Sequence, residues 1–320
     1  MRGACEQDDA IRATIGRQAR FSGQDTTASW PIEPMPTSSF DAIAPDAPVA
    51  AADDGLPSVP QAPVLGIPLA LIDYDGVLDW IDAAVALGAR EYLCVAAVHT
   101  VMESRDDEAL RAAVDGAAFT VPDGQPLAWA LRKLGHEIDA RVYGPELMER
   151  ACARAARSGQ RFYLYGGRDD KALAQLAGNL LDRHPGLQIV GGYSPPFHEL
   201  PAAELDEVAA RIDAARADVV WVGIGVPKQE KWMAAMRDRL DAPVLVGVGA
   251  AFDFHAGLIP QAPAWMQRRG LEWLFRLLQE PRRLWKRYAR HNPRFVAGFA
   301  RQWATHRRER GDRSGARSAR

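Results

Sequence analysis

The sequence predicts an α/β protein with a mostly parallel sheet, helices on both faces and a basic helical appendage at its C-terminal end. Short apolar runs alternate with helical patterns from residue 91 to residue 248, as is typical of a parallel sheet covered by helices. Three of the runs end in glycine, and aromatic and basic residues are interleaved beyond residue 270. This order of elements is that of a Rossmann-like fold.

Composition and cysteine usage restrict the class of protein. The chain has 320 residues, of which 48% are hydrophobic and 25% charged, which is ordinary for a soluble globular protein. No apolar run reaches the roughly 18 residues that a membrane span needs, and the N-terminus lacks the apolar stretch of a signal peptide. Cys5, Cys94 and Cys152 have no paired spacing, so we expect reduced thiols in a cytoplasmic protein.

Charge is distributed unevenly along the chain. The formal net charge is −2, but the segment from Arg268 to Arg320 carries +12 and the remainder −14. A basic end on an acidic body indicates an anionic partner, such as a membrane surface, a nucleic acid or a phosphorylated substrate.

These shifts in composition divide the chain into four predicted segments. Residues 1–62 are rich in Ala, Pro, Asp and Ser and are predicted to be a disordered leader or linker. Residues 63–269 form the predicted Rossmann-like domain. Residues 270–305 form an amphipathic basic helical segment, and residues 306–320 a disordered basic tail.

The first half of the domain begins with an extended chain at residues 64–72. Residues 77–85 then have helical apolar spacing. Residues 91–98 have the pattern of a buried strand, residues 100–114 of one helix, and residues 117–121 of a second strand.

The chain then passes through the turn Pro122-Asp123-Gly124 into a helix at residues 127–134. Residues 141–144 are a short strand or loop, and Pro145 suits the first turn of a helix at residues 146–157.

The second half repeats the alternation of strands and helices. The predicted strands are residues 161–165, 187–191, 218–224 and 243–248. The predicted helices are residues 169–184, 201–215 and 228–240.

Asp123 is the first candidate for chemistry. It lies between a strand and a helix, at the edge of the sheet where ligands of open α/β folds bind. Asp is also a preferred residue for capping a helix N-terminus. The local sequence favours a cap and leaves a catalytic carboxylate open.

Glycine-rich strand ends are the second signal. Each lets backbone amides approach a phosphate, although glycine after a strand is common in any α/β fold. Three in one sheet favour a nucleotide-type ligand. They are Gly166-Gly167, Gly223-Ile-Gly225 and Gly247-Val-Gly249.

The segment after Gly225 places Lys228, Gln229 and Glu230 on the first turn of a helix. Lys228 is suited to meet a phosphate, and Gln229 to bond a hydroxyl or a base edge. A solvated first turn of helix-favouring residues explains the same pattern.

Other acidic and histidine residues have simpler explanations. Asp253 and His255 are candidates for acid–base chemistry, but a lone His between apolar residues is more often structural. Asp73-Tyr74-Asp75 has a spacing used for divalent cations, yet capping of the following helix explains it better. We expect no metal ligand set.

The C-terminal segment carries two apolar stripes with basic residues between them. Phe295, Phe299 and Trp303 recur at spacings of four, and Trp285 precedes them. For this part we favour a helix lying on an anionic membrane over an ordinary packed helix. Its basic residues include Arg282, Arg283, Lys286 and Arg287.

Taken together, the chain resembles the WecG/TagA/CpsF family of bacterial glycosyltransferases from about residue 64 to residue 295. The segments that carry the resemblance are Pro122-Asp123-Gly124, residues 141–148, residues 223–230, residues 252–257, Ala262-Pro263 and residues 271–283.

The resemblance implies an inverting, metal-independent hexosyltransferase without a cofactor. Such an enzyme moves a sugar from a UDP-sugar to a polyprenyl-diphosphate-linked saccharide during surface or exopolysaccharide assembly. It works as a peripheral protein on the inner face of the cell membrane.

The resemblance also assigns residues. Asp123 is the implied general base, and Arg141 joins it as a catalytic residue. The basic residues 282, 283, 286 and 287 are expected at the membrane and over the acceptor diphosphate. The residues expected to bind the donor are Gly124, Gly166, Gly167, Gly223, Gly225, Pro227, Lys228, Gln229, Glu230 and Asp253.

The chain departs from the family at Val95 and Ala97, where Thr and Asn are usual. Neither side chain can form a hydrogen bond. His99, which follows closely, is one candidate to compensate. The alternative function is therefore a weakly active or non-catalytic sugar-nucleotide-binding subunit of a membrane assembly complex.

Two other functions are disfavoured. A nicotinamide dehydrogenase would need a GxGxxG turn after its first strand, and a nucleic-acid-binding tail fits the aromatic stripe less well than a lipid surface does. Homo-oligomerisation stays open.

Overall fold

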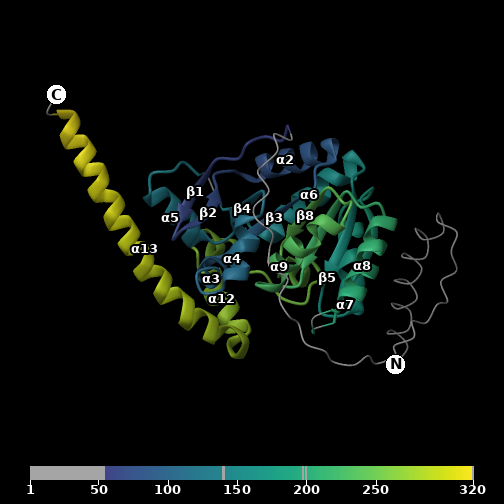
Figure 1. The fold of residues 1–320 in the computed structure, drawn as a ribbon. Helices are drawn as coiled ribbons and strands as arrows, with labels where there is room; N and C mark the ends of the chain where they lie inside the picture. Colours follow the sequence, from purple (N-terminus) through teal and green to yellow (C-terminus); the bar gives the residue numbers. More distant parts are fainter. Residues whose placement is uncertain (1–54, 139–140, 197, 199, 319–320) are drawn as a thin grey trace, which may run out of the picture. The chain divides into compact units, whose positions relative to one another are not determined.

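A six-stranded parallel sheet organises the chain, in the order β4-β3-β8-β7-β5-β6 (Figure 1). The computed structural model describes residues 55–138, 141–196, 198 and 200–318. The strands of this sheet are β3 (Glu91–Ala96), β4 (Phe119–Pro122), β5 (Arg161–Gly166), β6 (Gln188–Tyr193), β7 (Val219–Gly223) and β8 (Val244–Gly247).

Helices cover both faces of the sheet. Alternate residues of one strand enter different cores, as the two-residue period of a strand requires: Trp221 of β7 packs into one core and Val222 into the other. The helices on the Trp221 side include α2 (Tyr74–Leu87), α6 (Gly144–Ser158) and α7 (Asp170–Arg183). Those on the Val222 side include α8 (Ala202–Ala214) and α9 (Lys228–Met236), which η2 (Arg237–Arg239) follows. The predicted fold class is thus confirmed.

Two predicted segments differ from the structure at the start of the domain. The expected extended chain is an antiparallel hairpin of β1 (Gln61–Val64) and β2 (Ile67–Ala70). The single helix expected at residues 100–114 is two helices, α3 (Val98–Glu103) and α4 (Glu108–Asp115). The break is fixed by Asp107, whose Oδ1 accepts a hydrogen bond of 2.9 Å from the backbone N–H of Leu110.

Residues 141–143, expected as a strand or loop, lead directly into α6. The remaining helices of the described residues are short, except for the last. They are α5 (Gln125–Lys133), α10 (Ala251–His255), α11 (Ala264–Arg268), α12 (Glu272–Gln279) and α13 (Pro281–Ser318). Because α13 is continuous to Ser318, helix occupies residues 306–318, where the sequence predicted a disordered tail.

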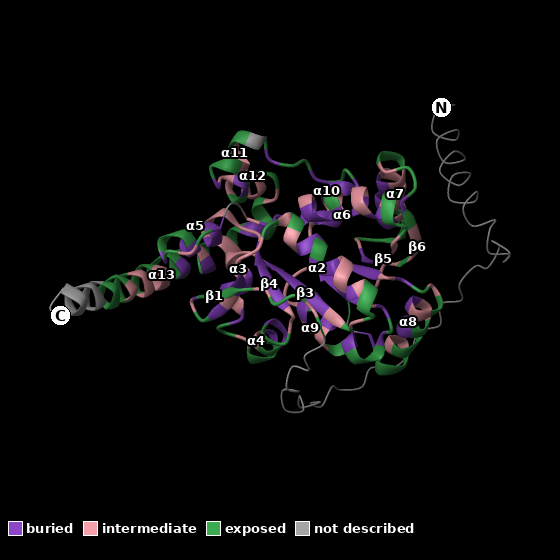
Figure 2. Ribbon diagram, turned by 90° about the horizontal axis from the view of Figure 1, so that it is seen from above, coloured by how far each residue is buried: buried purple, intermediate pink, exposed green. Residues whose placement is uncertain are grey.

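A third core joins the β1–β2 hairpin, α3, α4 and α5 to α13. Phe295 is only 6% exposed in this core, and Phe299 packs against it. The prediction that these two rings face a membrane is therefore wrong. Most residues of α13 from 296 to 310 are exposed (Figure 2). Within the described residues, none of the helices is both long enough and apolar enough to span a bilayer.

The predicted leader lies almost entirely outside the described residues, which begin at Gly55.

Candidate functional site

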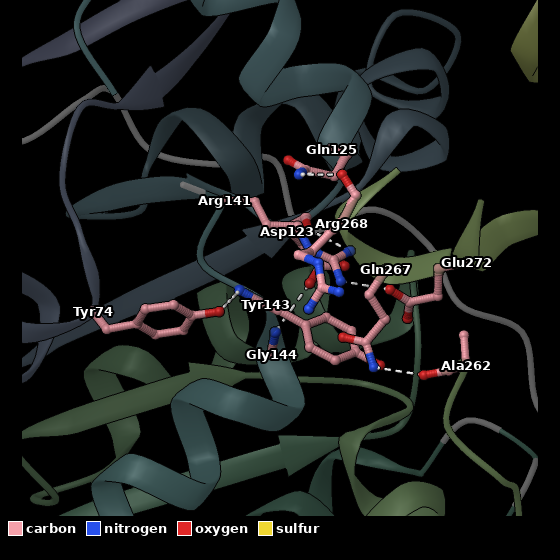
Figure 3. A network of polar contacts seen from close by, with 10 residues as sticks. All are labelled: Tyr74, Asp123, Gln125, Arg141, Tyr143, Gly144, Ala262, Gln267, Arg268 and Glu272. Atoms are coloured by element: carbon pink, nitrogen blue, oxygen red, sulfur yellow. Dashed lines mark hydrogen bonds and ion pairs between the residues drawn. The ribbon is translucent and has the colours of Figure 1, made fainter. Parts of the chain in front are cut away.

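Asp123 leaves the sheet at the end of β4 and is turned toward a neighbouring helix. Its backbone N–H donates to the carbonyl of Ala96 at 2.8 Å, which fixes the turn to β3. The residue that caps α5 is Gly124. Asp123 Oδ1 instead accepts a hydrogen bond of 3.0 Å from the backbone N–H of Gly144, the first residue of α6 (Figure 3). The local prediction of a cap on the helix that follows Asp123 is therefore wrong, because the carboxylate meets the N-terminus of α6.

Burial controls the acidity of this carboxyl. The pKa of Asp123 is raised from 3.8 to about 6, chiefly by burial and also by the negative charge of Glu272. Arg141, the Gly144 N–H and Arg276 act in the opposite direction. A carboxyl with this pKa is ionised at neutral pH and is also basic enough to accept a proton from a reacting group.

Arg141 is held beside Asp123 by three contacts. Its Nη1 donates to the backbone carbonyl of Asp123 at 3.3 Å, and its Nη2 donates to Glu272 Oε2 at 2.6 Å. The guanidinium also lies 4.3 Å from the ring centroid of Tyr143. The Arg141 side chain is only 11% exposed, so its position is fixed by α12 and by the segment before α6.

Glu272 is a site residue that the sequence pattern alone did not identify. It is the first residue of α12 and is 7% exposed. Its signal was present, since a carboxylate stands between Leu271 and Trp273 in an apolar stripe. A charged residue on a packed helix face needs a buried partner, and Arg141 is that partner.

Two tyrosines complete this wall of the site. The backbone N–H of Tyr143 donates to Tyr74 Oη at 3.0 Å. The hydroxyl of Tyr143 is buried and has no hydrogen-bond partner among the described residues. This hydroxyl lies close to Glu272, since the carboxylate contributes to raising the pKa of Tyr143.

The glycine-rich strand ends meet at the same edge of the sheet. Gly166 pairs with Gly223 between β5 and β7, and the N–H of Gly167 donates to the Gly223 carbonyl at 3.3 Å. A Cβ on Gly166 would lie 2.6 Å from the Gly223 backbone, so Gly166 tolerates no side chain at this crossing. The structure thus brings Gly166, Gly167 and Gly223 together, and Gly225 lies in the turn toward α9 with φ +80°.

The polar residues on the first turn of α9 differ in exposure, since one is exposed and two are buried. Lys228 is exposed and follows Pro227, which has a cis peptide bond. Gln229 and Glu230 are buried, and Gln229 Nε2 donates to Glu230 Oε1 at 2.9 Å. Burial raises the pKa of Glu230 to about 7.

Gln229 lies under the glycine end of β8. Its amide oxygen would be 3.2 Å from a Cβ on Gly249, and that oxygen has no hydrogen-bond partner among the described residues. The amide therefore supports the loop after β8 from below.

Asp253 forms an ion pair with Arg168, a partner that the sequence pattern did not predict. Arg168, which follows Gly167, donates from Nε to Asp253 Oδ1 at 2.9 Å and from Nη2 to Oδ2 at 3.1 Å. This bidentate pair lies at the glycine-rich ends and couples the loop after β5 to α10.

Two predicted structural roles are confirmed. His255 accepts at Nδ1 from Arg183 at 2.9 Å and has Nε2 2.9 Å from the Pro145 carbonyl, so it ties α10 to α7 and α6. Asp73 caps α2 through a 2.8 Å hydrogen bond from the Gly76 N–H.

The four basic residues expected over the acceptor diphosphate are not equivalent. Arg282, Arg283 and Lys286 are exposed, and Arg283 is paired with Glu280 at 2.6 Å. Arg287 is partly buried, and burial lowers its pKa.

Arg287 and Arg276 form a positive cluster with His99 at the start of α3. Burial lowers the pKa of His99 to about 3, and the charges of Arg287 and Arg276 contribute to this shift. His99 is therefore neutral at the pH of the cell, and the positive charge of the cluster comes from the two arginines. Arg276 also lowers the pKa of Asp123, so this arginine acts on the carboxylate as well.

Val95 and Ala97 lie on either side of Ala96, whose carbonyl accepts from the Asp123 N–H. Val95 is 8% exposed, and its Cγ1 would be 3.5 Å from a Cβ on Gly144, the residue that donates to Asp123. Ala97 caps α3, and its backbone N–H donates to Thr100 Oγ1 at 3.3 Å. Val95 therefore places an apolar side chain next to the residue that donates to Asp123.

This arrangement is suited to proton abstraction next to an anion. A carboxylate of raised pKa stands beside Arg141, the charge of Arg276 also acts on it, and glycine ends of other strands lie at the same edge of the sheet. Acid–base chemistry and anion binding can therefore take place at one end of the sheet.

Comparison with known proteins relates the chain to one family. The sequence is similar to the N-acetylglucosaminyldiphosphoundecaprenol N-acetyl-beta-D-mannosaminyltransferase of Bacillus subtilis (strain 168), with 31% identity over 169 residues. The match covers 53% of this chain and 63% of the relative, so the chain spans less than two thirds of that protein's length. The profile of the Glycosyl transferase WecG/TagA/CpsF family matches residues 62–309, which is most of the chain. The chain therefore belongs to the Glycosyl transferase WecG/TagA/CpsF family.

Proposed function

We propose that the protein is an inverting glycosyltransferase that moves a sugar from a UDP-sugar to a polyprenyl-diphosphate-linked saccharide. The observation that carries the proposal is the Asp123 carboxylate, with a pKa of about 6 at the N-terminus of α6. The name of the Bacillus subtilis relative supports a glycosyl acceptor linked to a polyprenyl diphosphate.

In this mechanism, Asp123 removes the proton of an acceptor hydroxyl. The acceptor oxygen then attacks the anomeric carbon on the face opposite the leaving UDP, which inverts the configuration. Arg141 fixes the backbone of Asp123 through its 3.3 Å hydrogen bond, and Glu272 keeps that guanidinium in place.

Negative charge that develops on the donor diphosphate needs a positive environment. We assign this to the backbone amides at the Gly166-Gly167 and Gly223–Gly225 ends and to Lys228 at the start of α9. Helix N-termini favour anions in such a position. Arg276, whose charge acts on Asp123, and Arg287 are assigned to the acceptor diphosphate. With these cations the transfer is proposed to proceed without a metal ion.

A membrane surface is the proposed place of reaction. Arg282, Arg283 and Lys286 are exposed at the start of α13, and Trp285 between them is 53% exposed. Leu278, which precedes these residues in the sequence and lies in α12, is 70% exposed. Exposed aromatic and apolar side chains next to cations favour a peripheral position on the anionic inner face of a cell membrane.

Replacement of Asp123 by Asn tests the catalytic assignment. D123N keeps the acceptor oxygen for the Gly144 N–H but cannot take up a proton. We expect turnover of a UDP-sugar with a membrane lipid extract to fall by roughly 10²–10⁴-fold, with UDP binding retained. D75N, at an exposed position of α2, is the control. Turnover of D123N equal to that of the unmodified protein would contradict the assignment.

A second function is favoured by Val95 and Ala97, which leave the site without two polar side chains. In this alternative the protein is a sugar-nucleotide-binding subunit of a membrane assembly complex. The same assay with a panel of UDP-sugars separates the two functions, since binding without transfer for every donor supports the subunit.

A further inference from the structure

A basic groove lies between the C-terminal end of α5 and the later turns of α13, away from Asp123. It has a volume of about 380 Å³ and is lined by Arg132, Lys133, Trp303, His306, Arg307 and Arg310. This volume is in the range of small-molecule sites. Asp123 precedes the other end of α5, and the nine residues of that helix separate the two places by about 13 Å.

The side chains from α13 are on one face of that helix. Trp303, His306, Arg307 and Arg310 follow the spacing of three and four residues that places side chains together. Arg310 reaches the turn after α5, where its Nη1 would be 2.7 Å from a Cβ on Gly135. The missing side chain at Gly135 therefore allows a guanidinium to approach the backbone there.

Trp303 forms the floor between the two helices. Its ring centroid is 5.8 Å from Lys133 Nζ and 5.1 Å from Arg307 Cζ. Cation–π contacts of this kind hold both cations near one point. His306 Nε2 is buried and has no hydrogen-bond partner among the described residues.

Three cations of the groove lack a nearby counter-charge. Within the described part of the chain, no carboxylate lies within 4.0 Å of Lys133, Arg307 or Arg310. Glu309 lines the adjacent groove, which shares His306. The helix dipole favours basic residues at the end of α5, but it does not explain two arginines of another helix at the same place.

We propose that this groove is a second anion site, which binds a phosphate group and is separate from the transferase site. Converging guanidinium and ammonium groups are the usual partners of phosphate oxygens, and the arginines can each donate two hydrogen bonds. The phosphate belongs to the headgroup of an anionic phospholipid or to a soluble phosphate ester. Both present the same oxygens to the groove.

The test compares two double variants of the full chain. K133A/R307A removes two exposed cations from the groove. R301A/R308A removes two exposed cations from the same α13 helix at positions that line neither groove. Each variant loses the same charge, and thermal unfolding verifies that both remain folded.

Binding of sn-glycerol 3-phosphate is measured by calorimetry, and binding to phosphatidylcholine vesicles is measured with and without phosphatidylglycerol. We expect K133A/R307A to bind glycerol phosphate at least about tenfold more weakly, as expected for the loss of charge-assisted hydrogen bonds, and R301A/R308A to be unchanged. A larger loss of phosphatidylglycerol-dependent vesicle binding in K133A/R307A than in R301A/R308A identifies a lipid headgroup as the source. Equal vesicle binding by the two variants, together with the loss for glycerol phosphate, identifies a soluble ester.

The proposal is overturned if glycerol phosphate does not bind the unmodified protein or binds both variants equally. If the two variants lose vesicle binding equally and bind glycerol phosphate equally, the loss of vesicle binding is only a general charge effect. Because neither variant alters the Asp123 site, the result is independent of whether the protein is a glycosyltransferase.

Discussion

Asp123 combines a high pKa with a position that keeps it ionised at neutral pH. Burial and Glu272 raise its pKa, whereas Arg141, Arg276 and the Gly144 N–H oppose the rise. The balance leaves a carboxylate that is more basic than an exposed Asp. Such a group is a better proton acceptor, and it also destabilises the folded protein when it is ionised.

The raised pKa predicts how activity depends on pH. A general base must be ionised, so kcat/KM is expected to fall about tenfold per pH unit below pH ~6. The measurement is the profile of kcat/KM against pH, which reports ionisation in the free enzyme. An acidic limb near the ordinary Asp value of 3.8 would show that burial does not control this group.

The same shift predicts a gain of stability in D123N. The pKa is higher in the folded state, so the stability that Asp123 contributes is present below pH ~4 and lost as pH rises through about 6. Asn has no charge to bury and still accepts from Gly144. We expect D123N to be more stable by about 1–2 kcal/mol at pH 7 and equal to the unmodified protein at pH 4. Urea unfolding at the two pH values measures this difference, and lower stability of D123N at pH 7 would contradict it.

Val95 is an apolar residue close to the start of α6, where Asp123 is bound. Its apolar wall lies beside the Gly144 N–H that bonds to Asp123. V95T would add a hydroxyl near the carboxylate and favour the ionised form. We expect the acidic limb of the pH–rate profile to move down by roughly half a pH unit to one unit. V244T, in the same core at the opposite end of the strands, should leave the limb unchanged.

At the scale of elements, α12 completes the site by carrying one carboxylate to the edge of the sheet. The side chains of Glu272 and Arg141 are only 10% and 11% exposed, so each reduces the cost of burying the other. The pair attaches α12 to the segment between α5 and α6. A helix far along the chain thus determines the position of a guanidinium beside Asp123.

Replacement of Glu272 by Gln tests whether the ion pair with Arg141, and not only the packing of α12, determines the properties of the site. E272Q keeps the shape but leaves the Arg141 charge buried without its counter-charge, which costs about 3 kcal/mol. The pKa of Asp123 should fall, because Glu272 raises it and unneutralised Arg141 lowers it. Unfolding experiments and the pH–rate profile measure the two effects. E280Q, at the other end of α12, is the matched control, and equal effects of both variants would exclude a specific role for Glu272.

At the scale of the whole molecule, α13 is both part of the core and a basic arm. Its first half is anchored by Leu284, His291 and Phe295, which are at most 6% exposed. Arg294 adds a bidentate ion pair with Asp106 at 2.6 and 2.7 Å. The later turns carry the exposed basic residues that form the groove with α5.

A pair of adjacent residues tests this division of α13. Phe295 is 6% exposed and Val296 is 66% exposed. We expect F295D to lower the free energy of unfolding by roughly 3–5 kcal/mol through loss of packing and burial of a charge. V296D should change it by less than about 0.5 kcal/mol. Urea unfolding measures both, and equal stability would mean that α13 does not dock in solution.

The order of the elements was determined by the sequence alone, because strand and helix periodicities are local properties. Apolar runs predicted every strand of the large sheet, and strand-end placement identified Asp123 and the glycine pairs at one edge. The family's motifs, such as Pro122-Asp123-Gly124, are local in the same sense, since each is a run of adjacent residues.

Only the tertiary structure decided which partner each of these residues meets. Asp123 bonds to Gly144, 21 positions away, and Arg141 pairs with Glu272, 131 positions away. Phe295 entered the core because α13 lies on the hairpin and α3, although its spacing favoured a membrane face. Local sequence determines periodicity and polarity, whereas burial, pairing and pKa depend on groups that only folding brings into contact.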